Sequence, residues 1–393
     1  MRFDHLFYRS MTRRTALVAA AAWPVAGAAA EPLQRLQVGP ARPVATLALA
    51  ARLARDGALV EVDAGVYVDD VAVWTQNDLT LRAVGGRVRL LSQGASAEGK
   101  GIWVVRGERV QVQGFDFEGA RVPSRNGAGI RFERGTLHVR DCRFLHNEMG
   151  LLTGNDPAST LDVEDSEFAF NQRPDGHNHN LYVGAIGRVS VTGSYLHHAR
   201  TGHLLKSRAA VSVIAYNRLT DEDGTASYEL EFPNGGEAWV VGNLVQQGEQ
   251  TENEHLVAYG AEGYRWPANA LRMAHNTLVD GRGSGGVFLR IAPGHGLVRL
   301  QNNLLVGDGA LGAPAGADLR RNARAAIADL ASAATGDYRL RPGAAAVNQA
   351  RLEPQDDTAG RLVPSREYRH PCGTAALAGP PRHPGALQGL AAR

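Results

Sequence analysis

Ionisable side chains are concentrated between residues 177 and 231, and their types suit proton abstraction next to a carboxylate. The candidate catalytic and ligand-facing residues in this run are His177, His179, His203, Lys206, Arg208, Glu229 and Glu231. An amine or an imidazole can act as a general base, and a guanidinium can bind a carboxylate through two parallel hydrogen bonds. A uronic acid carries a weakly acidic proton beside its carboxylate. The first chemistry that we expect is therefore β-elimination on an acidic polysaccharide.

The spacing of these residues predicts which of them share a surface. Successive side chains of a strand point to opposite faces, so Lys206 and Arg208 should both point outward, and so should Glu229 and Glu231. Neighbouring strands lie about 5 Å apart. Lys206 and Glu231 are one repeat apart, so we expect them to be neighbours on adjacent strands, which would bring two cations and two carboxylates together.

The identity of the base stays open in the sequence. Arg208 would favour the free amine of Lys206, whereas Glu231 would favour its ammonium form. If the second effect is larger, His203 or His179 becomes the better base. His177 and His179 could also face a metal ion, although two imidazoles do not define a metal site.

Other functions are also compatible with these residues. Glu229 and Glu231 could act as the carboxyl pair of a glycoside hydrolase. A non-catalytic carbohydrate-binding module could use aromatic side chains such as Tyr264 and Trp266, and an epimerase remains possible. A charged ladder on a solvated sheet face is the plain structural alternative. The residues that we expect to contact a substrate are His177, Asn180, Tyr182, Tyr228, Asn234 and Tyr259.

A short repeated phrase predicts the elements that position these side chains. A small or polar residue, one spacer and a large apolar residue recur at intervals of roughly 23 to 33 residues, which is typical of solenoids. The phrase occurs as Cys142-Arg143-Phe144, Ser166-Glu167-Phe168, Ser194-Tyr195-Leu196, Asn217-Arg218-Leu219, Asn243-Leu244-Val245, Asn276-Thr277-Leu278 and Asn303-Leu304-Leu305. Units this small must stack on one another. We predict an all-β chain folded as a right-handed parallel β-helix.

The asparagines of this phrase predict an internal ladder. Asn217, Asn243, Asn276 and Asn303 recur once in each unit. Stacked amides can satisfy the backbone groups that a buried turn leaves unpaired. We therefore assign these four residues a structural role.

The chain divides into four predicted parts. Residues 1–30 resemble an export signal of the twin-arginine type, with Arg13-Arg14 before an apolar run that ends in Ala28-Ala29-Ala30, and they predict a periplasmic or secreted protein. Residues 31–100 should form an N-terminal cap with a helix over 44–55, followed by the first coils. Residues 101–310 should form the β-helix, and 311–393 a C-terminal cap and irregular tail.

Composition limits the expected partners. The formal net charge is only +2, so we expect no nucleic acid partner, and no apolar run is long enough to span a bilayer. We expect a monomer. Cys142 and Cys372 are far apart in sequence, and we favour two free thiols over a disulfide.

The tail resembles a family of known fold. The phrase Tyr338-Arg339-Leu340-Arg341-Pro342-Gly343 is similar to the ending of many bacterial right-handed β-helix proteins of the pectate-lyase-like superfamily. This resemblance covers the repeats and the tail. It implies the fold and leaves the reaction open.

A second resemblance concerns the charged run. Leu204-Leu205-Lys206-Ser207, Tyr216-Asn217 and Ser227-Tyr228-Glu229-Leu230 resemble the catalytic stretch of chondroitinase-B-like alginate lyases. The resemblance implies Lys206 as the base and makes Ca²⁺ a possible cofactor. The family's arginine one coil later corresponds to the position of Glu231, and its paired glutamates precede the lysine, whereas Glu229 and Glu231 follow it.

Overall fold

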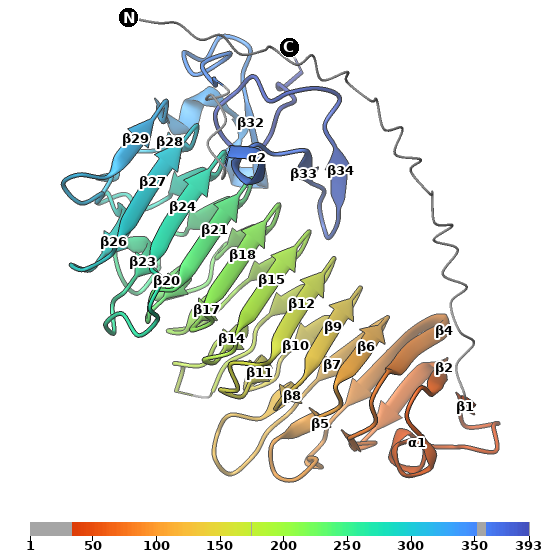
Figure 1. Cartoon of the computed structure of the whole chain (residues 1–393). Coiled ribbons are helices and arrows are strands. Elements are labelled where there is room, and N and C mark those ends of the chain that lie inside the picture. The colour runs from red at the N-terminus through yellow and green to blue at the C-terminus, as the bar shows by residue number, and fades with distance from the viewer. Residues whose placement is uncertain (1–33, 174, 352–358, 393) are drawn as a thin grey trace, which may run out of the picture. The chain divides into compact units, whose positions relative to one another are not determined.

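Parallel strands stacked in successive coils make up the described part of the chain (Figure 1). The computed structural model describes residues 34–173, 175–351 and 359–392. The predicted export signal at 1–30 lies outside the described residues. Within the described ranges, no helix has the length and apolar character that crossing a bilayer requires.

Each coil contributes one strand to a nine-stranded parallel sheet. Its strands are β3 (Ala72–Trp74), β5 (Gly101–Val105), β8 (Ala128–Phe132), β11 (Met149–Thr153), β14 (Leu181–Val183), β17 (His203–Ser207), β20 (Tyr228–Phe232), β23 (His255–Tyr259) and β26 (Val287–Ile291).

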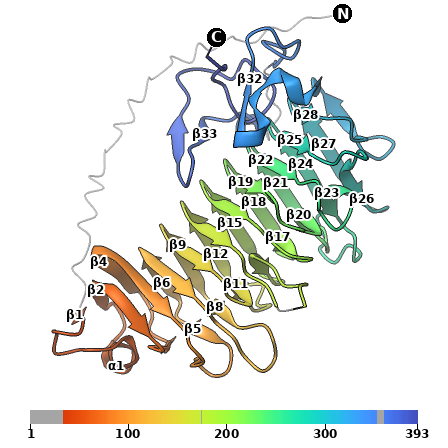
Figure 2. The same ribbon diagram turned by 180° about the vertical axis from the view of Figure 1, so that it is seen from behind.

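The other strands of the coils form a 21-stranded sheet, which Figure 2 shows from behind. It begins with three longer or terminal strands, β1 (Arg35–Val38), β2 (Leu59–Val68) and β4 (Leu79–Leu91). One stack then holds β6 (Arg109–Gln113), β9 (Thr136–Arg140), β12 (Thr160–Glu164), β15 (Arg188–Thr192), β18 (Val211–Ala215), β21 (Glu237–Val241), β24 (Ala270–Ala274), β27 (Leu297–Gln301) and β29 (Asp318–Arg320). The other holds β7 (Phe115–Glu118), β10 (Arg143–Leu145), β13 (Glu167–Ala169), β16 (Tyr195–His197), β19 (Arg218–Thr220), β22 (Leu244–Gln247), β25 (Thr277–Asp280), β28 (Leu304–Val306) and β30 (Ala323–Ala325).

This arrangement confirms the predicted all-β right-handed parallel β-helix. The repeated sequence phrase falls on the stack that runs from β7 to β30, where the large apolar residue of each phrase points into the core. Phe117, Phe144 and Phe168 stack there with ring centroids 5.0 and 4.6 Å apart. One apolar side chain per coil thus makes a continuous column, which a single coil could not bury alone.

The predicted asparagine ladder is confirmed. The side-chain amide of Asn217 donates to Asn243 at 3.0 Å, Asn243 donates to Asn276 at 2.9 Å, and Asn276 donates to Asn303 at 2.9 Å. Each amide also donates to a buried backbone carbonyl, as Asn243 does to Ile214. The ladder extends one coil further, to Asn322.

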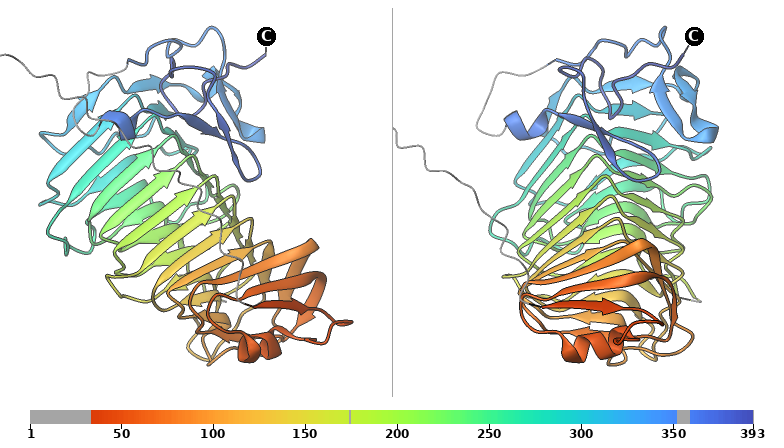
Figure 3. Two further views of the ribbon diagram at one scale, coloured as in Figure 1. Left: turned by 45° about the vertical axis from the view of Figure 1, so that its right-hand side comes forward. Right: turned by 90° about the vertical axis from the view of Figure 1, so that its right-hand side faces the viewer.

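A helix and an irregular tail lie at opposite ends of the coils (Figure 3). Helix α1 (Leu47–Leu53) falls within the predicted span, and Thr46 caps it by accepting a hydrogen bond from the backbone of Leu49. The tail contains the turns η1 (Ile327–Asp329) and η2 (Ala333–Thr335), the hairpins β31 (Leu330–Ser332) with β32 (Asp337–Leu340) and β33 (Arg366–Tyr368) with β34 (Thr374–Ala376), and α2 (Ala359–Leu362). Cys142 and Cys372 are both free thiols, as expected.

Candidate active site

One column of outward side chains on the nine-stranded sheet carries three of the candidate residues, Tyr182, Lys206 and Glu231. Strand pairing places Lys206 beside Tyr182 on one neighbouring strand and beside Glu231 on the other. The predicted adjacency of residues 206 and 231 is therefore confirmed. In coil order the full column is Val73, Val104, Arg131, Leu152, Tyr182, Lys206, Glu231, Ala258 and Arg290.

Two carboxylates and two cations form a connected network around Lys206. The ammonium group of Lys206 lies 2.8 Å from Oε2 of Glu231 and 2.9 Å from Oε1 of Glu262. The guanidinium of Arg208 lies 2.7 Å from Oε2 of Glu262. The carboxylate of Glu262 is thus held between the two cations, while its side chain keeps 41% of its surface exposed.

Arg208 is fixed by neutral partners as well. Its Nε donates to the hydroxyl of Tyr182 at 2.7 Å, and one terminal nitrogen donates to Oδ1 of Asn234 at 2.6 Å. The indole of Trp266 donates to the carbonyl of Arg208 at 2.9 Å. These contacts orient the guanidinium toward an open cleft of about 580 Å³, lined by Asn155, Tyr182, Ala185, Arg208, Asn234, Glu262, Arg265 and Trp266.

Two histidines and a tyrosine lie beside Lys206. Nε2 of His203 is 2.8 Å from Oε2 of Glu231, and Nδ1 of His203 is buried and has no hydrogen-bond partner among the described residues. The rings of His203 and Tyr228 are 5.2 Å apart. The hydroxyl of Tyr228 accepts a hydrogen bond from Arg290. His203 is therefore an imidazole with a carboxylate behind it and an unused nitrogen.

His179 is less suited to accept a proton. Burial, together with the charges of His203 and Lys206, lowers the pKa of His179 well below its ordinary value. Its Nδ1 already accepts the backbone N–H of His203 at 3.0 Å. The lone pair that a neutral imidazole offers is thus occupied by the backbone, which suits a positioning role for His179.

Both outward carboxylates are ionised near neutral pH. Burial alone would raise the pKa of Glu231, but contacts with His203 and Lys206 outweigh it and leave the pKa below its ordinary value. The hydrogen bond from Arg208, followed by the contact with Lys206, lowers the pKa of Glu262 to about 2. Neither group is a proton donor of the kind that hydrolysis of a glycosidic bond requires.

Glu229 corrects the prediction of two outward glutamates. The strand ladder pairs His203 with Tyr228 and Leu205 with Leu230 but omits Leu204 and Glu229. At this bend Glu229 and Leu230 both face the core, so the strict alternation of a strand fails. Glu229 is fully buried, and neither of its carboxylate oxygens has a hydrogen-bond partner among the described residues.

Burial raises the pKa of Glu229 well above its ordinary value. This glutamate is therefore an interior carboxyl group. The sheet separates it from Glu231, which lies on the outer surface, and the two cannot act on one substrate as a pair.

Two predicted substrate contacts are also structural. Tyr259 is fully buried, and its hydroxyl donates to the carbonyl of Gly236 at 2.6 Å. Asn180 belongs to a second amide ladder, because it accepts from Asn171 at 2.8 Å and donates to the carbonyl of His197 at 2.7 Å. His177 is exposed in the segment before β14. Tyr182, Tyr228 and Asn234 do lie on the outer face with Lys206 and Arg208.

Glu262 was not predicted as a site residue. This residue comes from the loop after β23 and reaches back to strand β17. Glycines at 260 and 263 both have positive φ and bracket a tight turn, and the backbone of Glu262 donates to the carbonyl of Pro233 at 2.9 Å. The local signal in the sequence is an acidic residue between Gly260 and Gly263, which does not indicate the coil onto which the loop folds.

The carboxylates do not fit a calcium site. Calcium prefers several oxygen ligands with uncompensated negative charge, whereas Glu231 and Glu262 already contact Lys206, and each has a further cationic or imidazole partner. Within the described ranges, no group of three or more His, Cys, Asp or Glu side chains is arranged to hold a metal ion.

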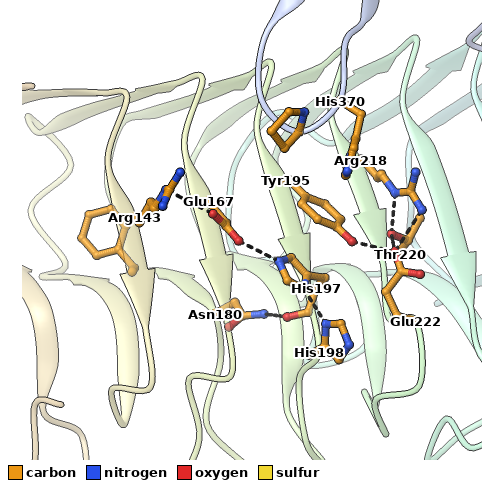
Figure 4. Close-up of polar contacts among 12 residues, drawn as sticks. Arg143, Glu167, Asn180, Tyr195, His197, His198, Arg218, Thr220, Glu222 and His370 are labelled. Atoms are coloured by element: carbon orange, nitrogen blue, oxygen red, sulfur yellow. Dashed lines mark hydrogen bonds and ion pairs between the residues drawn. The ribbon is translucent and has the colours of Figure 1, made fainter. Parts of the chain in front are cut away.

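A second polar cluster lies on the 21-stranded sheet, under the C-terminal tail (Figure 4). His197 contacts Glu167 at 3.2 Å, and the hydroxyl of Tyr195 donates to Glu222 at 2.8 Å. Arg218 pairs with Glu222 at 3.0 Å.

The tail covers this cluster directly. Arg218 donates to the tail carbonyl of Gly336 at 3.2 Å, and the ring of His370 lies 5.1 Å from that of Tyr195 (Figure 4). Gly373 donates to the carbonyl of Gly193 at 2.7 Å. Since its charges pair with one another and with the tail, the cluster serves as the anchor of the C-terminal segment.

Comparison with known proteins identifies the fold. No family model matches this chain, and no curated protein matches it. Among solved structures, the crystal structure of pectate lyase Pel9A is similar over 90% of this chain and 96% of that chain, with a TM-score of 0.61 and 14% sequence identity. The chain has a pectate-lyase-like β-helix fold.

Proposed function

We propose that this protein is a polysaccharide lyase that cleaves a uronate-containing polymer by β-elimination on the outer face of the nine-stranded sheet. The observation that carries the proposal is the carboxylate of Glu262, held at 2.7 and 2.9 Å by Arg208 and Lys206. A pair of cations that binds one carboxylate in an open cleft suits the carboxylate of a uronic acid. The pectate lyase fold adds weak support, because fold alone does not determine the reaction.

The residues support a division of roles in that reaction. Lys206 and Arg208 would replace Glu262 with the substrate carboxylate and stabilise the negative charge that develops on it. His203, backed by Glu231, would take the proton from the carbon next to that carboxylate. The electron pair forms a carbon–carbon double bond, and the bond to the leaving sugar oxygen breaks. The hydroxyl of Tyr228, which accepts from Arg290, would supply the proton that the leaving oxygen needs.

The test is a panel of polygalacturonate, alginate and hyaluronan, assayed for unsaturated ends by ultraviolet absorbance with and without chelator. We expect turnover on one uronate polymer. His203→Gln should lower kcat by about 10² to 10⁴, the range for a lost general base, and Lys206→Ala should lower it by about 10² or more.

The matched control is Arg188→Ala, which removes an exposed cation from β15 on the other sheet. Turnover that is the same in Lys206→Ala and in the control would refute the residue assignment. New reducing ends without absorbance would indicate hydrolysis instead. Binding of uronates without any product would indicate a carbohydrate-binding module.

We also propose that the protein acts in the periplasm or outside the cell. Arg13-Arg14 and the apolar run that ends in Ala28-Ala29-Ala30 support this location. Fractionation of cells that express the full chain, with Arg13 and Arg14 replaced by lysine as the comparison, tests it. Retention of both forms in the cytoplasm would refute the proposal.

A further inference from the structure

Two cations on the candidate face have no acidic partner, in contrast to those at its centre. Lys206 and Arg208 each contact a carboxylate. Within the described ranges, no carboxylate pairs with Arg131 or Arg290, and the Nε atom of Arg131 is buried without a hydrogen-bond partner. Burial lowers the pKa of this half-buried guanidinium, and the nearby charge of Glu133, which forms no ion pair with it, offsets that only in part. An anionic ligand would relieve the cost of that burial.

The two unpaired cations are evenly placed about Lys206. Strand pairing runs from Arg131 through Leu152 and Tyr182 to Lys206, which makes three steps. It runs from Lys206 through Glu231 and Ala258 to Arg290, which makes three more. With a strand spacing near 4.8 Å, each cation lies about 14 Å from the central one.

That spacing corresponds to a periodic ligand. A pyranose unit has about the length of one strand spacing, so a chain that follows the column meets a cation at about every third sugar. A chain that turns by about one third of a revolution per sugar returns every third carboxylate to the same side. Between the cations, Leu152 packs with Met149 and Tyr182 in a small apolar cluster outside the main core. An apolar surface of this kind suits the face of a sugar ring.

We propose that Arg131 and Arg290 are anion subsites at the two ends of the groove, and that the groove takes a uronate chain whose carboxylates face the sheet at three-sugar intervals. This inference rests on the proposed function for the chemical class of its ligand. Arg290 reaches the ligand beside Tyr228, whose hydroxyl it already contacts. Arg131 reaches it at the opposite end, beyond Leu152.

The test compares ligands that differ in length. Binding of a galacturonate disaccharide and a galacturonate octasaccharide is measured by calorimetry in a His203→Gln background, which limits cleavage. We expect Arg131→Gln and Arg290→Gln each to weaken octasaccharide binding by about tenfold, since a hydrogen bond to a charged group is at stake. Binding of the disaccharide should weaken by less than about twofold in both variants.

Arg52→Gln is the matched control, because it removes an exposed cation from helix α1, away from the groove. Arg290 is exposed, so its variant keeps the test informative if Arg131→Gln does not fold. The subsites would be overturned if Arg131→Gln and Arg290→Gln both bound the octasaccharide as tightly as Arg52→Gln does. This holds even if unsaturated products still form.

The converse outcome separates the two proposals. Octasaccharide binding that depends on Arg131 and Arg290, without any unsaturated product from the unsubstituted protein, would support the subsites and refute the lyase. Failure of the unsubstituted protein to bind the galacturonate octasaccharide would refute the subsites, and the lyase would then stand only if alginate or hyaluronan gave unsaturated products. A neutral glucose octasaccharide should bind equally weakly to all forms, and a loss of its binding in the groove variants would contradict a role for charge.

Discussion

Glu262 should compete with the substrate for Lys206 and Arg208, and its removal should therefore strengthen the binding of a uronate. The substitution is Glu262→Gln, which keeps the shape of the side chain and removes its charge. In the unsubstituted protein a guest carboxylate must displace that of Glu262 from contacts of 2.7 and 2.9 Å. In the variant no carboxylate has to be displaced before the two cations can bind the guest.

The expected gain is modest because Glu262 is well solvated. Its side chain keeps 41% of its surface exposed, so water screens both ion pairs. Exposed pairs are worth about 0.2–1 kcal/mol each. Two of them give about 1 kcal/mol in total, which corresponds to an increase in affinity of about fivefold. The gain should shrink at high salt, since ions screen exposed charges.

The pH dependence follows from the lowered pKa of Glu262. A carboxyl group whose folded-state pKa is depressed to about 2 contributes its ion-pair stability fully above its unfolded value near 4.5, and loses it as the pH falls toward 2. The difference in affinity between Glu262→Gln and the unsubstituted protein should therefore be constant above about pH 5.

Calorimetric titration with a galacturonate trisaccharide, at low and high salt, measures the effect. Glu249→Gln is the matched control, because Glu249 is an exposed glutamate in the segment between β22 and β23. An affinity of Glu262→Gln that equals or falls below that of the control would refute the view that Glu262 occupies the place of a substrate carboxylate.

Three predictions concern stability. Glu229→Gln should raise the melting temperature at pH 7 by a few degrees and leave it almost unchanged at pH 4, because a raised folded-state pKa costs stability only as the pH rises above the unfolded value; equal shifts at both pH values would contradict this. Asn243→Ala should lower the free energy of unfolding by about 2–4 kcal/mol in denaturant titrations, since two ladder neighbours and a buried carbonyl lose their partner. Arg218→Met should make the C-terminal tail sensitive to protease at low enzyme concentration without changing turnover, because Arg218 links β19 to Gly336; resistance equal to that of the parent would show that the tail is anchored elsewhere.

The coils and the outward positions of Lys206 and Arg208 could be predicted from the sequence for the same physical reason. The repeated phrase places one large apolar residue in each coil, and alternation along β17 then puts Lys206 and Arg208 outside. Tyr259 was mistaken for a surface residue although the same logic places it inside. It lies one coil after Phe232 in the strand ladder, and alternation with the outward Glu231 places Phe232 inside.

The remaining errors come from places where alternation does not apply. Glu229 lies at a bend where the ladder omits Leu204 and Glu229, so the alternation of a regular strand does not apply to it. Glu262 lies in a loop, and the coil onto which a loop folds depends on its backbone contacts, such as the one to Pro233. Outward positions on strands can be predicted from a repeat, whereas loop residues that complete a site cannot.

The distribution of charge along the groove separates binding from catalysis. At the centre, Lys206 and Arg208 are compensated by Glu231 and Glu262, so this region adds little net attraction for a polyanion. At the ends, Arg131 and Arg290 have no acidic partner among the described residues. A uronate chain would then be held chiefly at its ends, and the attraction there would help its central carboxylate to displace Glu262. Such an arrangement favours long chains over short ones, because a short oligomer must displace Glu262 without the contacts at the ends. The kinetic signature that this distribution of charge requires is a ratio of kcat/KM for octasaccharide over trisaccharide that is well above one. The ratio should fall toward one in Arg131→Gln and stay unchanged in Arg52→Gln and Glu249→Gln.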